Sequence, residues 1–378
     1  MSELFKKDEK KVEYLELIYD LIFVFIIGKN NSLLHHTEGG RVQPGMFLAY
    51  ILCTLAVIQI WNFSAYYINM FGKNGLREHI FLFSNMFMLY FIAEGTSADW
   101  EAYHTQYHIA WALILLNIAL QYVIELRHAE GGQRAMIRNV LIILLIEAAL
   151  VLGMIPLYRL TGTELSYLPI IVGIVSTFIA PGASLPVAVN FEHLTERAML
   201  YVVFTFGEMV IAVGGYFDGE LSVRRVYFCV MAFLIVVGLF LSYGTVYDHI
   251  IDRGREDNGL LYMLFHVFLI FGLNTISTSL EFMQEDLIEL MPKMLSLIGS
   301  LLMFYVFLMA LVFRYSKTGC RPGAGFYAGL LALAASFAAL MLVFRDQMLV
   351  NIALSAAYVF IIYAVIYRIG KFNKNISG

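Results

Sequence analysis

The first apolar segment of the chain carries two carboxylates, Glu16 and Asp20, within the stretch EYLELIYDLIFVFII at residues 13–27. A spacing of four residues places both side chains on one face of a helix. An ionised group at the centre of a membrane costs about 2.5–3.5 kcal/mol, so such groups face a bundle interior or water and often mark ion or substrate routes. Other ionisable residues also interrupt apolar segments: Lys29, Glu147, Glu208 and His266.

Two interpretations of these residues are open. Each carboxylate can line a route for a solute, or it can accept hydrogen bonds from Tyr, Ser or Asn on a neighbouring helix and serve only in packing. For Glu147 and His266 the sequence favours neither interpretation. For Asp20 and Glu208 we favour a functional role, because the two acids hold matching places in an internal repeat described below.

The histidine pair of HTQYH, His104 and His108, also shares one face of a helix. Histidines at this spacing can bind zinc, but no cysteine and no third ligand stands at a recognisable spacing from them. We therefore expect no metal site here. The sequence also contains neither a Gly-rich phosphate-binding loop nor the serine elbow of hydrolases. It thus predicts no catalytic residue and identifies no cofactor.

The composition is that of a membrane protein with many spans. Of the 378 residues, 60% are hydrophobic and 14% are charged, whereas soluble domains are about 45–50% apolar and about 25% charged. The net charge is −4 and no long basic run is present, so we expect no nucleic-acid partner. The N-terminus lacks the short apolar core and cleavage site of a signal peptide. The three cysteines are isolated and suggest no disulfide framework.

A spanning helix needs about 20 predominantly apolar residues. The hydropathy pattern predicts an all-α bundle of about twelve such helices, joined by connections too short to hold a separate soluble domain. The predicted spans lie near residues 14–36, 46–70, 78–96, 104–126, 136–157, 165–187, 197–217, 225–247, 259–281, 293–315, 323–344 and 347–369.

The distribution of basic residues predicts that both termini are cytoplasmic. With the N-terminus inside, the inner segments hold 18 of the 25 Lys and Arg residues and the outer segments hold 7. Cytoplasmic segments of membrane proteins carry such an excess of Lys and Arg. The bias also implies an even number of spans.

The two halves of the chain resemble each other. YDLIFVF at 19–25 aligns with GEMVIAV at 207–213, and NGL at 74–76 recurs at 258–260. We therefore predict a parallel duplication of six spans each, over residues 1–190 and 191–378. Repeats of this kind often form a binding site where they meet. In the sixth span, Pro181, Gly182 and Pro186 predict a kink or a break.

Two motifs identify a family that the chain resembles. LELIYDLIFVF resembles the ELFFDLVFVF-like signature of the bacterial low temperature requirement A (LtrA) family, and HLTERAMLYVVFTFGE resembles its second signature. The second motif departs from the family at Ala198 and Met199, where a His-Gly pair is usual, and at Met209, where Ser is common. The resemblance implies a bacterial cytoplasmic-membrane protein and leaves its activity open. It singles out these residues of the second motif: His193, Glu196, Arg197, Gly207 and Glu208.

The first motif also resembles the first helix of the FSD-motif potassium-leak channels. Ile18 and Tyr19 replace the Phe and Ser of that pattern. Those channels are built from six-span units, so this resemblance implies a fold of that kind and does not imply potassium as the solute.

Our leading hypothesis is a transporter or channel for a small cation or polar solute. Glu16, Asp20 and Glu208 would line or brace its route, and Arg197 would balance their charge. One alternative is a membrane-embedded enzyme that acts on a lipid or isoprenoid; another is a structural or partner-binding membrane protein. The enzyme is the second of these three hypotheses, and we expect that the protein is not an enzyme. Membrane lipid, the solute and a second copy of the chain are the partners that we expect.

Overall fold

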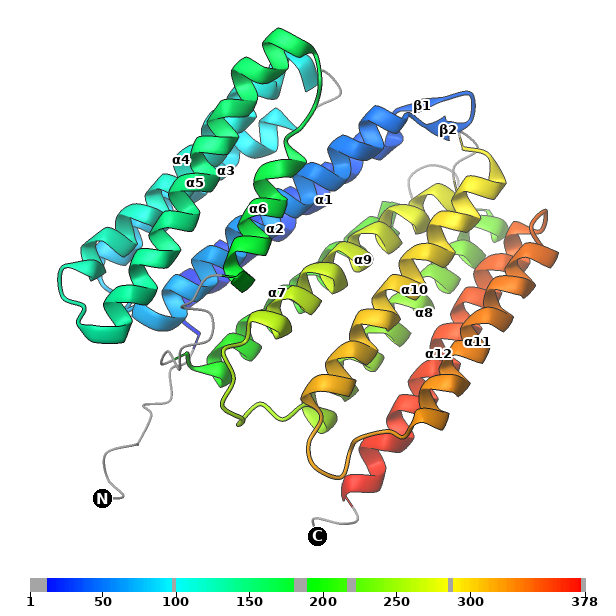
Figure 1. The fold of residues 1–378 in the computed structure, drawn as a ribbon. Helices are drawn as coiled ribbons and strands as arrows, with labels where there is room; N and C mark the ends of the chain where they lie inside the picture. The colour runs from blue at the N-terminus through cyan, green and yellow to red at the C-terminus, as the bar shows by residue number, and fades with distance from the viewer. Residues whose placement is uncertain (1–11, 97–99, 180–188, 216–221, 285–287, 375–378) are drawn as a thin grey trace. The chain divides into compact units, whose positions relative to one another are not determined.

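The computed structural model describes residues 12–96, 100–179, 189–215, 222–284 and 288–374. Within these residues the chain forms twelve α-helices and one two-stranded sheet (Figure 1). The predicted all-α class is therefore confirmed. The α-helices are α1 (Tyr14–Asn30), α2 (Pro44–Phe71), α3 (Leu76–Gly95), α4 (Trp100–Leu126), α5 (Gly131–Thr161), α6 (Tyr167–Ile179), α7 (Phe191–Gly214), α8 (Val223–Thr245), α9 (Leu260–Gln284), α10 (Leu290–Tyr315), α11 (Ala324–Val343) and α12 (Met348–Lys374).

Ten helices in the described part of the chain are long and apolar enough to span a membrane. The other two are α3 and α6. Charged residues near both ends of α3, namely Arg77, Glu78 and Glu94, lower its hydropathy, and the described part of α6 has only 13 residues. The predicted spans match the helices closely, although α7 begins at Phe191 and not near residue 197. The kink predicted at Pro181, Gly182 and Pro186 lies outside the described residues.

The chain divides into two compact units. The first comprises residues 1–33, 45–201 and 254–263, and the second comprises residues 34–44, 202–253 and 264–378. The main boundary between these units falls inside α7, after Tyr201. The boundary between residues 190 and 191 is predicted for the sequence repeats and stays a prediction, as does the parallel duplication.

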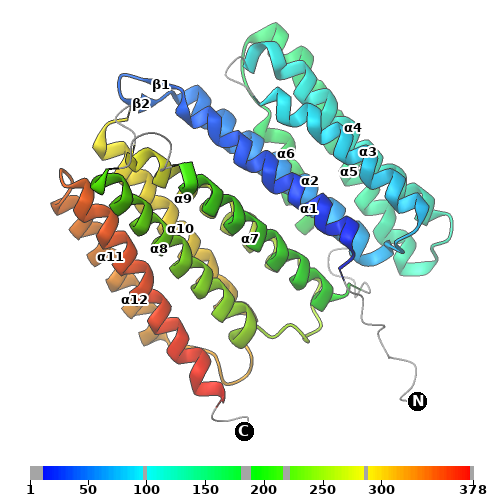
Figure 2. The same cartoon turned by 180° about the vertical axis from the view of Figure 1, so that it is seen from behind.

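In the first unit, α3 packs against α1 and α4, and α5 packs against α4 and α6 (Figure 2). Side chains of α2 reach the other helices of this unit. Ser64 bonds Tyr19 of α1 at 2.8 Å, and Gln59 bonds Glu147 of α5 at 3.4 Å. Asn69 bonds the backbone of Asn190, just before α7. Because these polar groups of α2 find partners inside the bundle, α2 can lie buried on most sides.

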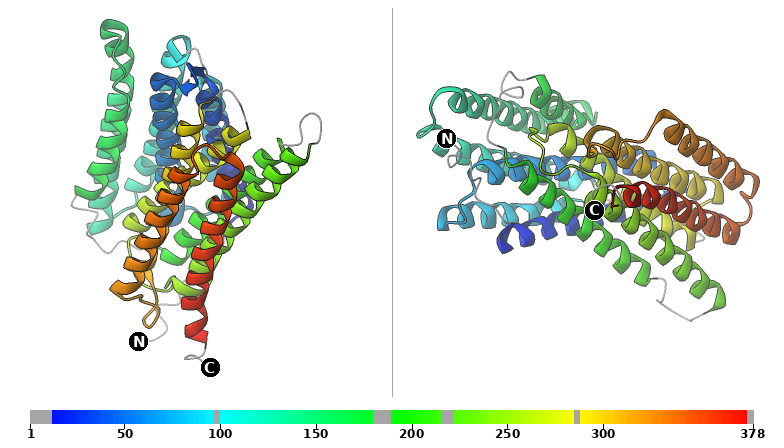
Figure 3. Two further views of the ribbon diagram at one scale, coloured as in Figure 1. Left: turned by 90° about the vertical axis from the view of Figure 1, so that its right-hand side faces the viewer. Right: turned by 90° about the horizontal axis from the view of Figure 1, so that it is seen from below.

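In the second unit, α8 packs against α12, α12 against α11, and α11 against α10 (Figure 3). A hydrogen bond of 2.6 Å between Ser279 and Ser296 joins α9 to α10. The π-helical turn Val246–Ile250 extends α8 and contacts α10 and α12. The strands β1 (Thr37–Glu38) and β2 (Arg41–Val42) form a short antiparallel hairpin, whose Gly40 accepts a hydrogen bond from the backbone of Glu289.

Candidate functional site

Three helices of the first unit bring charged side chains together in its interior. α1 supplies Glu16 and Asp20, α2 supplies Trp61, and the first part of α7 supplies His193 and Arg197. Each of these side chains is at most 5% exposed. The buried residues of α1 recur at helical spacing, whereas its other face, with Ile18, Leu21 and Phe25, is exposed. The two acids therefore face the interior, as their spacing predicts. We call these five residues the buried charge cluster.

Asp20 is the most tightly held member of the cluster. Trp61 donates its indole N–H to Oδ1 of Asp20 at 2.7 Å. Arg197 donates from Nη2 to the same oxygen and from Nε to Oδ2, the latter at 3.3 Å. A guanidinium that bonds both oxygens fixes the carboxylate in orientation as well as in charge. Arg197 thus pairs with an acid 177 residues away in the chain.

Oε2 of Glu16 makes two longer contacts. This oxygen lies 3.4 Å from Nε of Arg197 and 3.6 Å from Nε2 of His193. Charge-assisted N–H···O bonds are usually about 2.7–2.9 Å long. Glu16 therefore interacts electrostatically with both groups at distances greater than those of a tight ion pair.

Asn69 sets the proton position on His193. The Asn69 amide donates to the backbone carbonyl of Asn190 at 2.8 Å and accepts from the Asn190 N–H at 3.0 Å, which fixes the amide orientation. Its NH₂ group lies 3.1 Å from Nδ1 of His193, which must accept. A neutral His193 consequently carries its proton on Nε2, the nitrogen that faces Glu16.

Aromatic side chains enclose the Arg197 guanidinium. Its Cζ lies 5.9 Å from the centre of the Trp61 ring, within range of a cation–π interaction. The Trp61 ring in turn packs against Tyr201, with 4.3 Å between ring centroids. Sequence analysis did not single out Trp61 or Asn69. The available signal was the group of polar residues in a span that is otherwise apolar: Gln59, Ser64 and Asn69.

Glu147 forms a separate buried site in the first unit. Its Oε2 accepts a hydrogen bond of 3.4 Å from Gln59, which also donates to the Ile170 carbonyl. Gly173 of α6 packs directly on this pair, since a Cβ at that position would lie 2.0 Å from Glu147 Oε2 and 2.2 Å from Gln59 Nε2. The structure therefore gives Glu147 a neutral amide partner and places it outside the buried charge cluster.

Glu208 and His266 belong to the second unit. Glu208 is half-buried on α7, close enough to Glu281 for the two acids to interact electrostatically. Glu281 also lies 3.3 Å from Nε2 of His35. His266 is fully buried and bonds the Tyr243 hydroxyl at 3.0 Å, a contact that fits a role in packing.

The remaining motif residues lie on α7. Glu196 is partly exposed, and Gly207 is exposed. A Cβ at Gly207 would meet no heavy atom within 4 Å in the described part of the chain, so close helix packing does not explain this glycine. Lys29 of α1 forms an exposed ion pair of 2.7 Å with Glu94.

The fold gives the histidine pair a third neighbour that its spacing could not predict. Glu164, in the connection between α5 and α6, lies close to both His104 and His108. Gly162 ends α5 in a left-handed conformation, at φ +66°, which turns the chain toward the start of α4. Burial alone would raise the pKa of Glu164. The contact with His104 and the hydrogen bonds from Ser166 and Trp100 together outweigh burial and lower the pKa to about 2.

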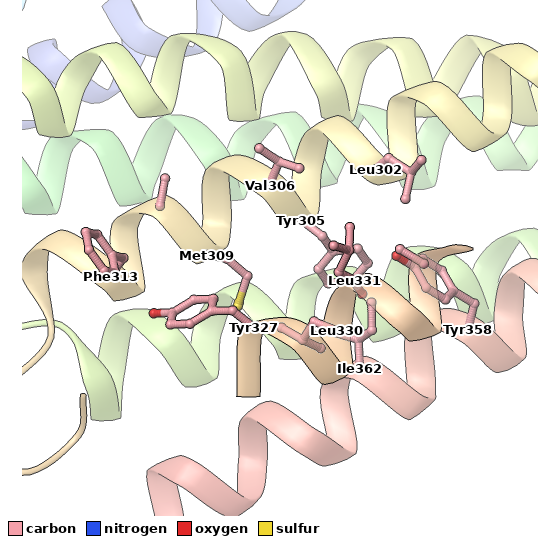
Figure 4. Close-up of a pocket in the computed structure, with 12 residues that line it drawn as sticks. Leu302, Tyr305, Val306, Met309, Phe313, Tyr327, Leu330, Leu331, Tyr358 and Ile362 are labelled. Carbon is pink, nitrogen blue, oxygen red and sulfur yellow. The ribbon is translucent and has the colours of Figure 1, made fainter. Parts of the chain in front are cut away.

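The second unit also contains an apolar pocket of about 430 Å³ between α10, α11 and α12 (Figure 4). Met309 and Phe313 of α10, Leu331 of α11 and Ile362 of α12 line it, and Tyr327 points its ring along one side. The lining carries no charged side chain, so this pocket suits hydrocarbon and not a cation.

Sequence comparison places this arrangement in a known family. The sequence model of the bacterial low temperature requirement A protein (LtrA) matches residues 11–365, a range that includes α1 and the whole of α7. No curated protein matches the sequence. The match covers nearly the whole chain, including the two motifs that supply four of the five residues of the buried charge cluster. The chain therefore belongs to the bacterial low temperature requirement A family of multi-pass membrane proteins.

Proposed function

We propose that this protein moves a small cation or polar solute across the membrane, and that a cation or proton binds at the buried charge cluster. The observation that carries the proposal is the charge balance of the cluster. Two carboxylates, Glu16 and Asp20, face one guanidinium, that of Arg197. With both acids ionised and His193 neutral, the five residues of the cluster together carry one net negative charge. One bound cation, or one proton on Glu16 or His193, neutralises it.

Asp20 and Glu16 differ in the lengths of their contacts with Arg197. Asp20 is held by Trp61 and by both donor groups of Arg197. Oε2 of Glu16 lies 3.4 Å from Nε of Arg197 and 3.6 Å from Nε2 of His193. We assign binding and release to Glu16 and His193, and positioning to Asp20 and Arg197. Burial supports a functional role, because buried ionic groups are expensive in membranes and typically serve ion routes or proton relays.

Glu208 extends the proposal to the second unit. It is a half-buried acid on α7, the helix that also carries His193 and Arg197. We propose that Glu208 binds the same solute at another stage of its passage. Glu208 is partly buried and lies near a second acid, Glu281, and both features suit a group that interacts with a cation.

Reconstitution into liposomes tests this proposal. Uptake of Na⁺, K⁺ and Rb⁺, and the movement of protons reported by an internal pH dye, would be compared with empty liposomes. We expect flux in the wild type, and its loss in Glu16→Gln, which keeps the size of the side chain but removes its charge. Glu94→Gln is the matched control, because Glu94 is an exposed acid in a peripheral ion pair.

The proposal fails if Glu16→Gln protein that is folded and inserted carries the same flux as the wild type. It also fails if no solute or proton moves in wild-type liposomes over a range of imposed gradients. Glu208→Gln tests the role of Glu208 separately from that of the buried charge cluster. Unchanged flux in this variant would contradict only the proposed role of Glu208.

A further inference from the structure

The first unit holds a second polar cluster, formed by His104 and His108 of α4 with Glu164 of the α5–α6 connection. One ligand atom from each residue lies within 4.8 Å of the other two. Both histidines are at most 1% exposed. The cluster lies where α4 begins and α5 ends, at the same end of the first unit (Figure 1). None of these residues contacts the buried charge cluster among the interactions described above, so the two sites are separate.

The hydrogen bonds of His108 leave Nε2 with a lone pair. Nδ1 lies 2.7 Å from the backbone carbonyl of His104, and a carbonyl can only accept, so Nδ1 carries the proton. Nε2 is then the basic nitrogen, and the Ser166 hydroxyl lies 2.5 Å from it. A backbone carbonyl that holds the other ring nitrogen is the usual support of a histidine that ligates a metal.

The ring nitrogens of His104 also point to a ligand. Neither of its ring nitrogens has a hydrogen-bond partner among the described residues, although the side chain is buried. Its ring is held between the rings of His108 and Tyr158, at 4.0 Å and 4.2 Å between centroids. Packing thus fixes the ring, while its nitrogens lack the hydrogen bonds that buried polar atoms almost always make.

The separation between His104 and Glu164 matches that of two ligands of a tetrahedral metal ion. Nε2 of His104 lies 3.4 Å from Oε2 of Glu164, longer than a usual charge-assisted hydrogen bond. Zinc bonds to histidine nitrogen and to carboxylate oxygen are about 2.0–2.2 Å long, so two ligands of a tetrahedral zinc ion lie about 3.4 Å apart. Trp100 donates to the same carboxylate oxygen at 2.8 Å, and the Ser166 N–H donates to the other at 2.9 Å, which orients Glu164.

We propose that His104, His108 and Glu164 bind one Zn²⁺ ion, and that the ion ties the start of α4 to the α5–α6 connection. Two imidazoles and one carboxylate are a ligand set that zinc accepts, with a fourth position left for water or for Ser166. The Ser166 hydroxyl is the neighbour that the ion replaces at Nε2 of His108. The site does not depend on the transport proposal, and its test uses no flux measurement.

Binding of Zn²⁺ and Co²⁺ to the full-length protein in detergent tests this inference. The protein would carry an affinity tag without histidines and be stripped with a chelator, and binding would be followed by calorimetry. We expect one ion per chain, a melting temperature that rises with added Zn²⁺, and the visible absorption of tetrahedral Co²⁺. Glu164→Gln and His104→Asn should each weaken binding at least about tenfold, since even loss of a supporting group has that effect.

His128→Asn is the matched control, because His128 is exposed just beyond α4; its binding should equal that of the wild type. The inference is overturned if wild-type protein binds no Zn²⁺, or if Glu164→Gln and His104→Asn bind it as tightly as the control. If a variant does not fold, the Co²⁺ spectrum of the wild type still decides, because a purely octahedral spectrum contradicts the proposed ligand set.

Discussion

At the scale of single residues, the main feature is a buried guanidinium that serves two acids. Arg197 is fully buried and lies against both Asp20 and Glu16. Removing one partner of a buried ion pair leaves a charge without compensation, which typically costs about 3–5 kcal/mol. The guanidinium therefore governs the stability of the cluster more than either acid does.

Arg197→Gln should be the most destabilising single change within the cluster, by about 3–5 kcal/mol, because it leaves two acids without their cation. Asp20→Asn should cost less in the Arg197→Gln background than in the wild type, because the double variant holds one acid fewer. Thermal unfolding of the four proteins in one detergent measures both effects. Purely additive costs would show that Asp20 and Arg197 are not coupled.

Two substitutions of Asp20 distinguish a functional role of this acid from a role in packing. Asp20→Asn keeps the size of the side chain and its hydrogen bond from Trp61 but loses the charge, so we expect a folded, inserted protein without flux. Asp20→Leu should lower stability as well, because Trp61 then loses its acceptor and Arg197 loses the nearer of its two acids. Melting temperature and flux, or growth in the cold as a substitute, are the measurements. If Asp20→Leu were stable and fully active, neither interpretation of this acid would survive.

At the scale of elements, the helix boundaries followed from the sequence and most contacts did not. Runs of about 20 apolar residues locate helices such as α2 and α10 without knowledge of their neighbours. The spacing of Glu16 and Asp20 also predicts their shared buried face. Their contact with Trp61 and Arg197 depends on which helices pack together, and one sequence does not encode that in any local pattern. The same holds for Glu164 beside His104.

A substitution of Gly173 tests how helix α6 packs against α2 and α5. Gly173→Ala should destabilise the protein by about 1–3 kcal/mol, the usual cost of overpacking, because its Cβ would overlap Glu147 and Gln59. Glu147→Ala in the same chain should recover part of the loss. Gly153→Ala is the control, since a Cβ there meets nothing within 4 Å and should be neutral or favourable. Equal melting temperatures for both alanine variants would contradict this packing.

At the scale of the whole molecule, the topology remains to be measured. The excess of Lys and Arg in alternate connections predicts an even number of spans with both termini cytoplasmic. Tags at residues 1 and 378 should therefore both resist external protease in intact cells, and both should be cleaved after lysis. Cleavage of one tag alone in intact cells would require an odd number of spans.

The first unit needs residues from both halves of the sequence, since His193 and Arg197 belong to it. A fragment of residues 1–190 keeps Glu16 and Asp20 but lacks their cation. When this fragment is expressed alone, we expect it to be degraded. Co-expression of residues 191–378 should restore the fragment to near wild-type abundance. The Arg197→Gln form of the second fragment should restore it poorly. Accumulation of residues 1–190 alone, measured by immunoblotting, would show that the cluster is dispensable for this half.

The separation of Asp20 from Arg197 in the chain has a consequence for biosynthesis. Ribosomes add about 5–20 residues each second, so α1 leaves the ribosome roughly 10–35 seconds before the arginine that lies 177 residues later. During that interval the translocon receives a first helix whose two acids do not yet have the guanidinium that compensates them, and their insertion carries a penalty of several kcal/mol. Trp61 follows Asp20 by only 41 residues and is the first of its partners to be made. The nascent chain must therefore retain α1 beside α2, or hold it with an insertase, until α7 is synthesised.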